Sequence, residues 1–255
     1  MKVVFVQFYR GTYFGMKNPE NLIEEALERG QSALSEHHSK RFLSGFGIPI
    51  TREILAYDAD SAAAGARDIG FPVVLKASGP KLTHKSEAGG VVLNLRNEED
   101  VKREGQRLLR LQGCEALLIQ EMVEGHRELV CGLIRNPLFG PCVMFGLGGV
   151  LTEILEDVVF RVAPLSSWDA RDMVQEIRGK KILKPFRGEE AADLSILCQT
   201  LMTLGEIGLR YEQVIGLDIN PLKIRPNGKP VAVDALIVLQ NEGRRESSSS
   251  LKDSG

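Results

Sequence analysis

Acidic and amide side chains near the carboxyl end of the chain carry the most specific chemical signal in the sequence. Asp218 and Asn220 end one β-branched apolar segment, and Asp234 lies inside the next. The Asn-Gly pair at Asn227 is a strong turn signal and predicts a hairpin. Such a hairpin places Asn220 opposite Asp234, with Cβ atoms roughly 4.5–5.5 Å apart. These oxygen ligands suit Mg²⁺ held jointly with substrate phosphates, and the alternative is an acid-capped turn.

A long connection between two expected strands, residues 78–89, is the second candidate site. About twelve residues is long for such a connection, and long connections in compact domains tend to be functional or disordered. The segment offers hydrogen-bond donors, a histidine and closing glycines: Thr83, His84, Lys85, Ser86, Gly89 and Gly90. Backbone N–H groups beside glycine, with lysine and hydroxyls nearby, suit a polyphosphate, and a solvated basic loop is the alternative.

A lysine within an apolar strand segment is the third candidate. Lys76 follows Val73, Val74 and Leu75 directly. Alternation along a strand puts Lys76 on the same face as Val74. The ammonium either projects into a cleft toward a phosphate or faces water from an edge strand.

Two glutamates, Glu121 and Glu128, flank a short polar segment between expected strands. Their carboxylates would meet at the mouth of one turn, where they could accept hydrogen bonds from ribose hydroxyls or an adenine amino group. Two surface acids beside a loop is the alternative. His126 lies in the same turn, while His37 and His38 are expected on the exposed face of a helix.

Hydrophobic periodicity and turn signals place these groups on a mixed set of elements. The expected helices are 19–30, 35–45, 60–69, 98–111, 168–177 and 190–209. The expected strands are 71–77, 90–95, 116–122, 128–134, 141–147, 154–162, 214–220 and 231–239. Hairpins rather than regular βαβ alternation predict an α+β fold.

Composition excludes several classes of protein. The chain has 255 residues, of which 32 are Lys or Arg and 34 Asp or Glu, giving a net charge of −2. This balance gives no electrostatic case for binding nucleic acid or a membrane surface. No run of about 18 apolar residues predicts a membrane span. Four widely spaced cysteines without a CxxC pair indicate reduced thiols in a cytoplasmic protein rather than a zinc site.

Several motifs in order resemble one family. PVVLKASGPKLTHKSEAGGVVLNL, LIQEMVEGHRELVCGLIRNPLFGPCVMFGLGGVLTEIL, FRVAPLS and IGLDINPL…VAVDA look like the ATP-grasp (β) subunit of ADP-forming acyl-CoA synthetases such as acetate–CoA ligase, in the succinyl-CoA synthetase superfamily. The resemblance spans about residues 35–239. It implies an ATP-grasp fold of two α+β subdomains with nucleotide in the cleft between them. The expected division is an extension at 1–18, a small subdomain with the N-terminal helices at 19–120, a large subdomain at 121–240 and a disordered tail at 241–255.

The resemblance also implies roles for single residues. Lys76 would contact nucleotide phosphate, Glu121 and Val123 would recognise adenine, and Glu128 the ribose. The phosphate cradle would comprise Thr83, Lys85, Ser86, Gly89 and Gly90. Asn220 and Asp234 would bind Mg²⁺, and Asp218 would lie beside the phosphoryl site. His84 would carry the phosphoryl group between a partner's phosphohistidine and ADP.

The family reaction is reversible: acyl-CoA, phosphate and ADP give acid, CoA and ATP. CoA and the acid bind mainly to an α subunit, so an α₂β₂ heterotetramer is the implied assembly. Two alternatives remain: a self-contained ATP-grasp carboxylate–amine ligase, and a non-catalytic nucleotide-binding regulatory module. The acyl group is not fixed by this sequence, because its pocket would lie on the partner.

Overall fold

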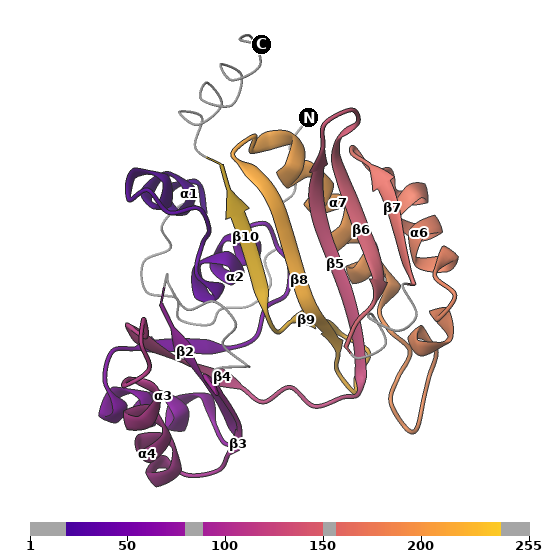
Figure 1. Cartoon of the computed structure of the whole chain (residues 1–255). Helices are drawn as coiled ribbons and strands as arrows, with labels where there is room; N and C mark the ends of the chain where they lie inside the picture. The colour runs from indigo at the N-terminus through magenta and orange to yellow at the C-terminus, as the bar shows by residue number, and fades with distance from the viewer. Residues whose placement is uncertain (1–18, 80–88, 150–156, 241–255) are drawn as a thin grey trace, which may run out of the picture.

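The computed structural model describes residues 19–79, 89–149 and 157–240, and builds two antiparallel sheets with helices packed on them (Figure 1). The predicted His84 and its neighbours Thr83, Lys85 and Ser86, like the expected extension and tail, lie outside the described residues. The helices and strands, in chain order, are α1 (Pro19–Glu28), α2 (Glu36–Gly45), β1 (Glu53–Ala56), α3 (Ala59–Ile69), β2 (Val73–Ser78), β3 (Val91–Leu95), α4 (Glu98–Leu108), β4 (Ala116–Glu121), β5 (Arg127–Asn136), β6 (Gly140–Leu147), β7 (Val158–Val162), α6 (Ser167–Glu176), the 3₁₀ helix η1 (Lys180–Leu183), α7 (Leu194–Arg210), β8 (Val214–Ile224), β9 (Pro230–Ala232) and β10 (Ala235–Leu239).

The smaller sheet has four strands in the order β1-β4-β2-β3. Alanines of α3 and apolar residues of α4 form one buried cluster with its strands. Strand β2 is apolar on both faces and lies in the sheet interior, with all six residues buried. The lysine within it is therefore buried too.

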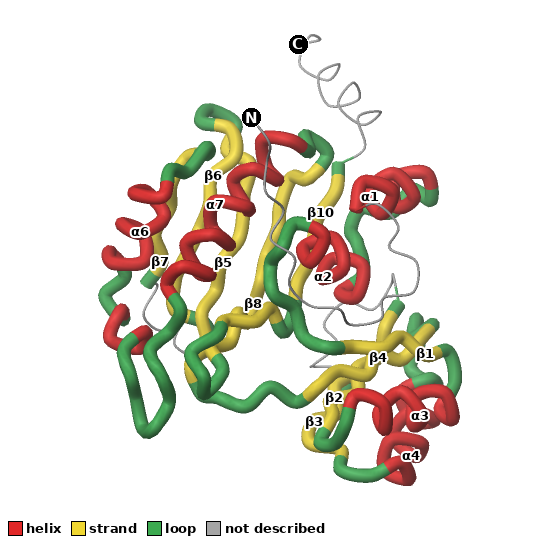
Figure 2. Tube along the Cα trace, turned by 180° about the vertical axis from the view of Figure 1, so that it is seen from behind, coloured by secondary structure: helices red, strands yellow, loops and turns green. Residues whose placement is uncertain are grey.

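The larger sheet has six strands, in the order β10-β8-β5-β6-β7 with β9 paired to β8. Helices α1, α2, α6 and α7 cover one face, as the view from behind shows (Figure 2). Alternate strand residues such as Leu133, Phe145 and Leu217 pack into that helical layer. Figure 1 looks onto the opposite face, which carries no helix among the described residues.

Side-chain caps explain where several helices begin. Ser35 caps α2, Asp58 caps α3 and Asn97 caps α4, each accepting a hydrogen bond from a backbone N–H of the first turn. Ser166 forms a full capping box with Asp169 at the start of α6. Such caps satisfy backbone donors that have no partner within the helix.

The α+β prediction and the existence of each expected element are confirmed, with shifts at their ends. Helix α7 begins at Leu194 rather than 190, because Asp193 caps it. Helix α4 ends at Leu108, before the turns that lead to Gly113. The expected strand 231–239 is interrupted between β9 and β10, and the interruption holds Asp234.

The expected boundary between the small and the large subdomain is at residue 120. That point lies within β4, just before the chain passes from the smaller sheet to the larger one. However, Leu22 and Ile23 of α1, and Phe42 and Leu43 of α2, belong to the core of the larger sheet. The four cysteines are free thiols, and none of the described helices is long and apolar enough to cross a bilayer.

Candidate active site

The predicted row of oxygen ligands lies on the helix-free face of the larger sheet. Leu217 and Ile219 of β8 face the helices, so Asp218 and Asn220 face the other way. The backbone N–H of Asn220 donates to the carbonyl of Asp234 at 3.2 Å. The predicted register of 220 against 234 is therefore confirmed.

The charges in this row repel one another. Burial raises the pKa of Asp218, and the neighbouring charge of Asp234 raises it further. Asn220 is exposed and the Asp234 side chain is 44% exposed, so oxygen atoms remain open to solvent at one end of the row. Two carboxylates and an amide of this kind fit a hard divalent cation, which would relieve the repulsion.

Lys76 reaches this row from the other sheet. Its ammonium lies 3.8 Å from Asp234 Oδ2 and donates to the carbonyl of Val233 at 3.3 Å. It also pairs with Glu36 Oε1 at 2.6 Å. The edge-strand alternative is wrong, because β2 lies between β4 and β3 and Lys76 is buried. The ammonium points into the contact between the sheets.

Glu121, at the end of β4, is held by two arginines. Its carboxylate accepts from Arg225 Nη2 at 2.6 Å and from the backbone N–H of Arg52 at 2.9 Å. Burial by itself would raise the pKa of Glu121, but these bonds outweigh it and hold the pKa below its usual value. Arg225 directly follows β8, so its pair with Glu121 joins the larger sheet to the smaller one.

Glu121 and Glu128 do not flank a hairpin turn. Strand β4 pairs within the smaller sheet and β5 within the larger one, so residues 122–126 cross from one sheet to the other. Lys223 bridges this crossing, since its ammonium donates to the carbonyl of Val123 at 3.4 Å and lies 3.5 Å from Glu128 Oε1. The connection is thereby fastened to β8.

Gly89 and Gly90 mark where the chain rejoins the smaller sheet after the undescribed segment. Gly90 accepts from the backbone N–H of Ala77, and the Gly89 carbonyl accepts from both terminal nitrogens of Arg107 at 3.2 Å. Gly89 has φ 64°, a left-handed conformation that favours glycine. This end of the predicted phosphate loop is therefore anchored between β2 and α4.

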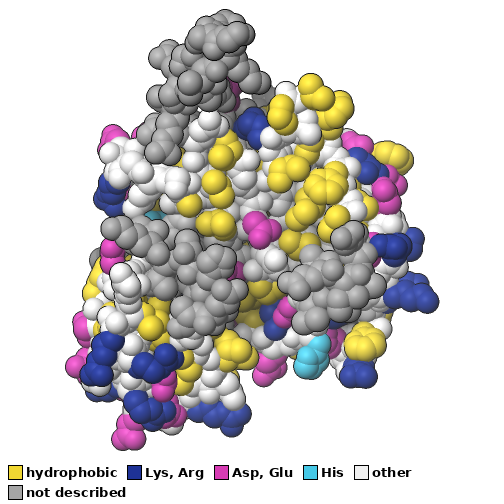
Figure 3. All heavy atoms as spheres, in the orientation of Figure 1, with side chains coloured by type: hydrophobic (Ala, Val, Ile, Leu, Met, Phe, Trp, Pro, Cys, Tyr) yellow, Lys and Arg dark blue, Asp and Glu magenta, His cyan; other side chains and the backbone are white. Residues whose placement is uncertain are grey.

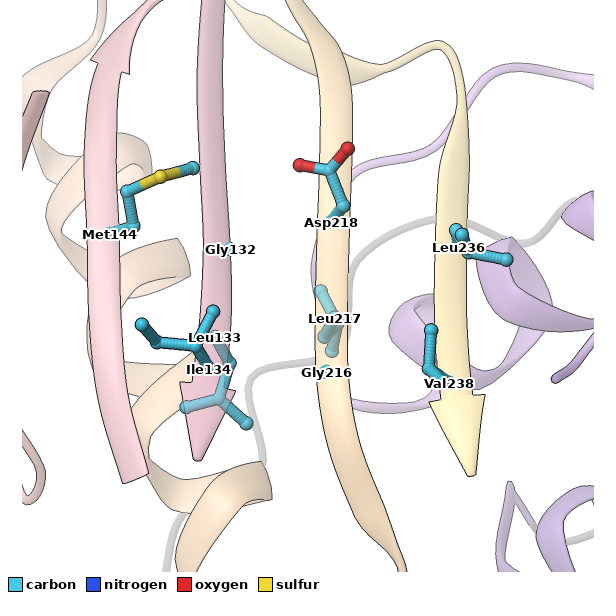
Figure 4. A pocket seen from close by; sticks show the side chains of 9 residues that line it. All are labelled: Gly132, Leu133, Ile134, Met144, Gly216, Leu217, Asp218, Leu236 and Val238. Carbon is cyan, nitrogen blue, oxygen red and sulfur yellow. The ribbon is translucent and has the colours of Figure 1, made fainter. Parts of the chain in front are cut away.

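A shallow cavity of about 230 Å³ lies on the helix-free face beside Asp218 (Figure 4). Gly132 and Gly216 leave room for it, and apolar side chains of β6 and β10 flank it. Its lining residues are Gly132, Leu133, Ile134, Met144, Gly216, Leu217, Asp218, Leu236 and Val238. Hydrophobic side chains also gather over β5, β6 and β7 on this face (Figure 3). Ile134, Phe160 and Val162 are each nearly half exposed.

Comparison with known proteins agrees with this geometry. Residues 25–239 match the model of the ATP-grasp domain. The chain belongs to the ATP-grasp family. It is 36% identical over 228 residues to the β subunit of acetate–CoA ligase (ADP-forming) II from Pyrococcus furiosus, covering 86% of this chain and 97% of the relative. It is 37% identical over 229 residues to acetate–CoA ligase (ADP-forming) I from Archaeoglobus fulgidus, covering 88% of this chain but 33% of that enzyme.

A solved relative shares the ATP-grasp fold in detail. The acetyl-coenzyme A synthetase 1 of Ca. Korarchaeum cryptofilum, in complex with coenzyme A and Mg-AMPPCP, superposes with a TM-score of 0.78. It is 42% identical, and the match covers 87% of this chain and all of the other chain. Its phosphohistidine segment points towards its nucleotide binding site. The chain thus matches whole β subunits but spans about a third of the length of the Archaeoglobus enzyme.

Some residues of this ATP-grasp site carried no recognised signal in the sequence. Glu36 and Lys40 are four residues apart on α2, which packs on the larger sheet. Both are buried charged residues that reach the site from this helix. Their spacing is that of an ordinary helix-surface pair, so burial alone distinguishes them. Lys223 of β8 and Arg225, which follows that strand, are likewise visible only once the register is known.

The expectation for two histidines is wrong. His37 donates or accepts through Nδ1 with Glu53 Oε1 at 2.8 Å, and His38 is half-buried. Burial, followed by the charge of His37, lowers the pKa of His38. Both are therefore half-buried rather than fully exposed, whereas His126 is exposed.

Proposed function

We propose that this chain is the nucleotide-binding subunit of an ADP-forming acid–CoA ligase. The enzyme would convert acyl-CoA, ADP and phosphate reversibly into a carboxylic acid, CoA and ATP. The observation that carries the proposal is the approach of Lys76 from the smaller sheet to Asp234 of the larger one, at 3.8 Å. A cation and a row of oxygen ligands at one junction suit a polyphosphate and its metal.

Each residue then has a task in phosphoryl transfer, which depends on positioning and charge neutralisation. Lys76 would bind a phosphate oxygen. Asn220 and Asp234 would hold Mg²⁺, which when bound would supply positive charge to neutralise the phosphates. Asp218, next in the row, would lie beside the transferred group and orient its carrier.

The crossing between the sheets would hold the nucleoside. Glu121 and Val123 would lie against adenine, and Glu128, fastened by Lys223, would accept from a ribose hydroxyl. Gly89 and Gly90 would close the phosphate cradle that also includes Thr83, Lys85 and Ser86. His84 would accept the phosphoryl group through an imidazole nitrogen and pass it to ADP.

A second chain completes the enzyme in this proposal. It would supply the CoA and acid sites and a phosphohistidine, in an α₂β₂ assembly. The half-exposed Ile134, Phe160 and Val162 support burial of the helix-free face by that partner. The four free thiols support a reducing compartment, the cytoplasm.

Calorimetry with the isolated chain tests the nucleotide site. Mg·ADP should bind, and Asp234→Ala should abolish this metal-dependent nucleotide binding while leaving the fold largely intact. Asp172→Ala, which removes an acid of α6 paired with Arg161, is the matched control. Unchanged Mg·ADP binding by Asp234→Ala would overturn the metal assignment.

A labelled-phosphate chase tests the relay. The complex with the partner is incubated with acyl-CoA and labelled phosphate, and ADP is then added. His84→Asn should leave the label on the partner and form no ATP, whereas the exposed-site control His126→Asn should transfer it normally. Transfer by His84→Asn at the unaltered rate would remove His84 from the mechanism.

A further inference from the structure

A chain of alternating charges runs through the contact between the two sheets. At its centre is Lys40 of α2, which is fully buried. Its ammonium pairs with Glu53 of β1 and donates to Gln120 Oε1 of β4 at 2.7 Å and to Thr51 Oγ1 at 3.3 Å. Lys40, whose helix packs on the larger sheet, thus bonds to Glu53 and Gln120 of the smaller sheet and to Thr51 just before β1.

Glu36, one turn earlier on α2, joins Lys40 to Lys76. The same oxygen, Oε1, lies 3.0 Å from Lys40 Nζ and 2.6 Å from Lys76 Nζ. The Glu36 side chain is only 2% exposed. Because one carboxylate charge is divided between two ammonium groups, neither lysine is fully neutralised by it.

The carbonyl of Val233 connects the same two lysines to the row of metal ligands. It accepts from Lys40 Nζ at 3.1 Å and from Lys76 Nζ at 3.3 Å. The next residue is Asp234. Glu36 therefore contacts the ammonium of Lys76, and Lys40 contacts the backbone that carries a proposed metal ligand.

We propose that Glu36, with Lys40 behind it, is a positioning residue for phosphate recognition, fixing Lys76 and the 233–234 backbone in the geometry that Mg·nucleotide requires. The inference rests on the proposed function and deepens it. Helix α2, which packs into the core of the larger sheet, would thereby fix the positions of the groups that bind phosphate.

Elementary physical chemistry explains the need for such a residue. A lysine carries a point charge on a flexible four-carbon stem, so its ammonium takes one fixed position only where acceptors hold it. Among described residues, Glu36 and Val233 provide the two acceptors within hydrogen-bond distance of Lys76 Nζ. An ammonium has three donors, so these two acceptors account for two of them.

The state of Lys40 agrees with a charged network. Burial by itself would lower the pKa of Lys40, but the charges of Glu36 and Glu53 outweigh it and raise the pKa above its ordinary value. Glu53 is held in turn by His37. Charges of opposite sign therefore alternate from His37 through Glu53, Lys40 and Glu36 to Lys76.

The substitution Glu36→Gln tests the inference because it preserves shape and removes the charge. Affinity for Mg·ADP, measured by calorimetry, should fall at least tenfold. Affinity for adenosine, measured by saturation-transfer NMR, should stay within twofold, because adenosine has no phosphate to meet Lys76. Glu176→Gln, which removes the same charge from an ion pair of α6, should change neither affinity.

A double variant separates positioning from stability. Glu36→Gln with Lys40→Met removes one charge of each sign, and apolar replacement of buried pairs is commonly tolerated. It leaves Lys76 without the carboxylate of Glu36, so Mg·ADP affinity should remain at least tenfold reduced in a folded chain. This variant also decides the matter if Glu36→Gln alone does not fold.

Two results would overturn the inference and leave the proposed function standing. One is an unchanged Mg·ADP affinity in Glu36→Gln. The other is a double variant that recovers Mg·ADP affinity together with stability, which would make Glu36 purely structural. Failure of the unaltered chain to bind Mg·ADP would instead refute the proposed function, and this inference with it.

Discussion

The hydrogen bonds that Glu121 accepts from Arg52 and Arg225 offer a quantitative test of how the two sheets are joined. Glu121→Gln keeps the size of the side chain and one oxygen, so the bond from the Arg52 backbone at 2.9 Å can persist. The bond from Arg225 Nη2 at 2.6 Å loses its charge partner. The Glu121 side chain is 11% exposed and that of Arg225 is 29% exposed, so solvent replaces little of the lost interaction.

The size of the effect follows from these exposures. A hydrogen bond to a charged group contributes about 1.5–3 kcal/mol to the free energy of unfolding. The Arg52 side chain is 65% exposed, so its ion pair with Glu121 adds only about 0–1 kcal/mol. We expect Glu121→Gln to lower the free energy of unfolding at pH 7 by about 2–3 kcal/mol, which corresponds to a melting temperature about 4–12 °C lower.

The effect must also depend on pH with a definite sign. Because the folded-state pKa of Glu121 lies below its usual value of 4.5, its contribution is fully present above the unfolded-state pKa. It is lost as pH falls through the folded-state pKa. Glutamine does not titrate, so the difference between the two proteins should be full at pH 7 and shrink below about pH 4.5.

Urea unfolding of both proteins at several pH values between 7 and 4 measures this difference. Glu98→Gln is the matched control, since it removes an exposed pair with Arg67 and should cost at most about 1 kcal/mol. A loss below about 1 kcal/mol for Glu121→Gln, or a loss that stays constant from pH 7 to 4, would refute the reasoning.

Further substitutions probe the larger sheet. Gly132→Ala should destabilise the protein by about 1–3 kcal/mol in urea unfolding, because its Cβ would lie 2.5 Å from the Leu217 carbonyl oxygen; a change within error would contradict the close approach. Gly216→Ala, whose Cβ would meet nothing nearer than 3.7 Å, should stay within about 0.5 kcal/mol and serves as its control. Phe145→Ala, in the fully buried helix-facing layer, should cost about 3–5 kcal/mol, and a smaller loss would argue against dense packing there. Val162→Asp should leave the melting temperature nearly unchanged but abolish co-purification with the partner, and retained co-purification would place the partner elsewhere.

Local signals in the sequence were sufficient for much of the fold. Ser35 and Asn97 mark helix starts because their side chains satisfy orphan N–H groups whatever the tertiary context. The Asn-Gly turn and the two-residue alternation of strands determine which residues face each other. For that reason Asn220 and Asp234 could be paired from the sequence.

Other features depended on which segments meet in space. The sequence left open whether Lys76 lay on an edge strand, because strand order is not a local property; pairing of β2 with both β3 and β4 decides it. Glu121 and Glu128 are close together in the sequence, yet Glu121 belongs to a strand of the smaller sheet and Glu128 to a strand of the larger one. Sequence spacing gave no indication of that crossing.

The residue types of the site were therefore determined by the sequence alone, and its electrostatic setting by the tertiary structure. A helix places Glu36 and Lys40 on one face by its own periodicity, and that pattern is identical for a solvated pair and a buried one. Only the packing of α2 against both sheets removes water from these charges and brings Glu36 Oε1 within 2.6 Å of Lys76. Burial and long-range pairing arise from contacts between residues far apart in the chain, so no local pattern encodes them.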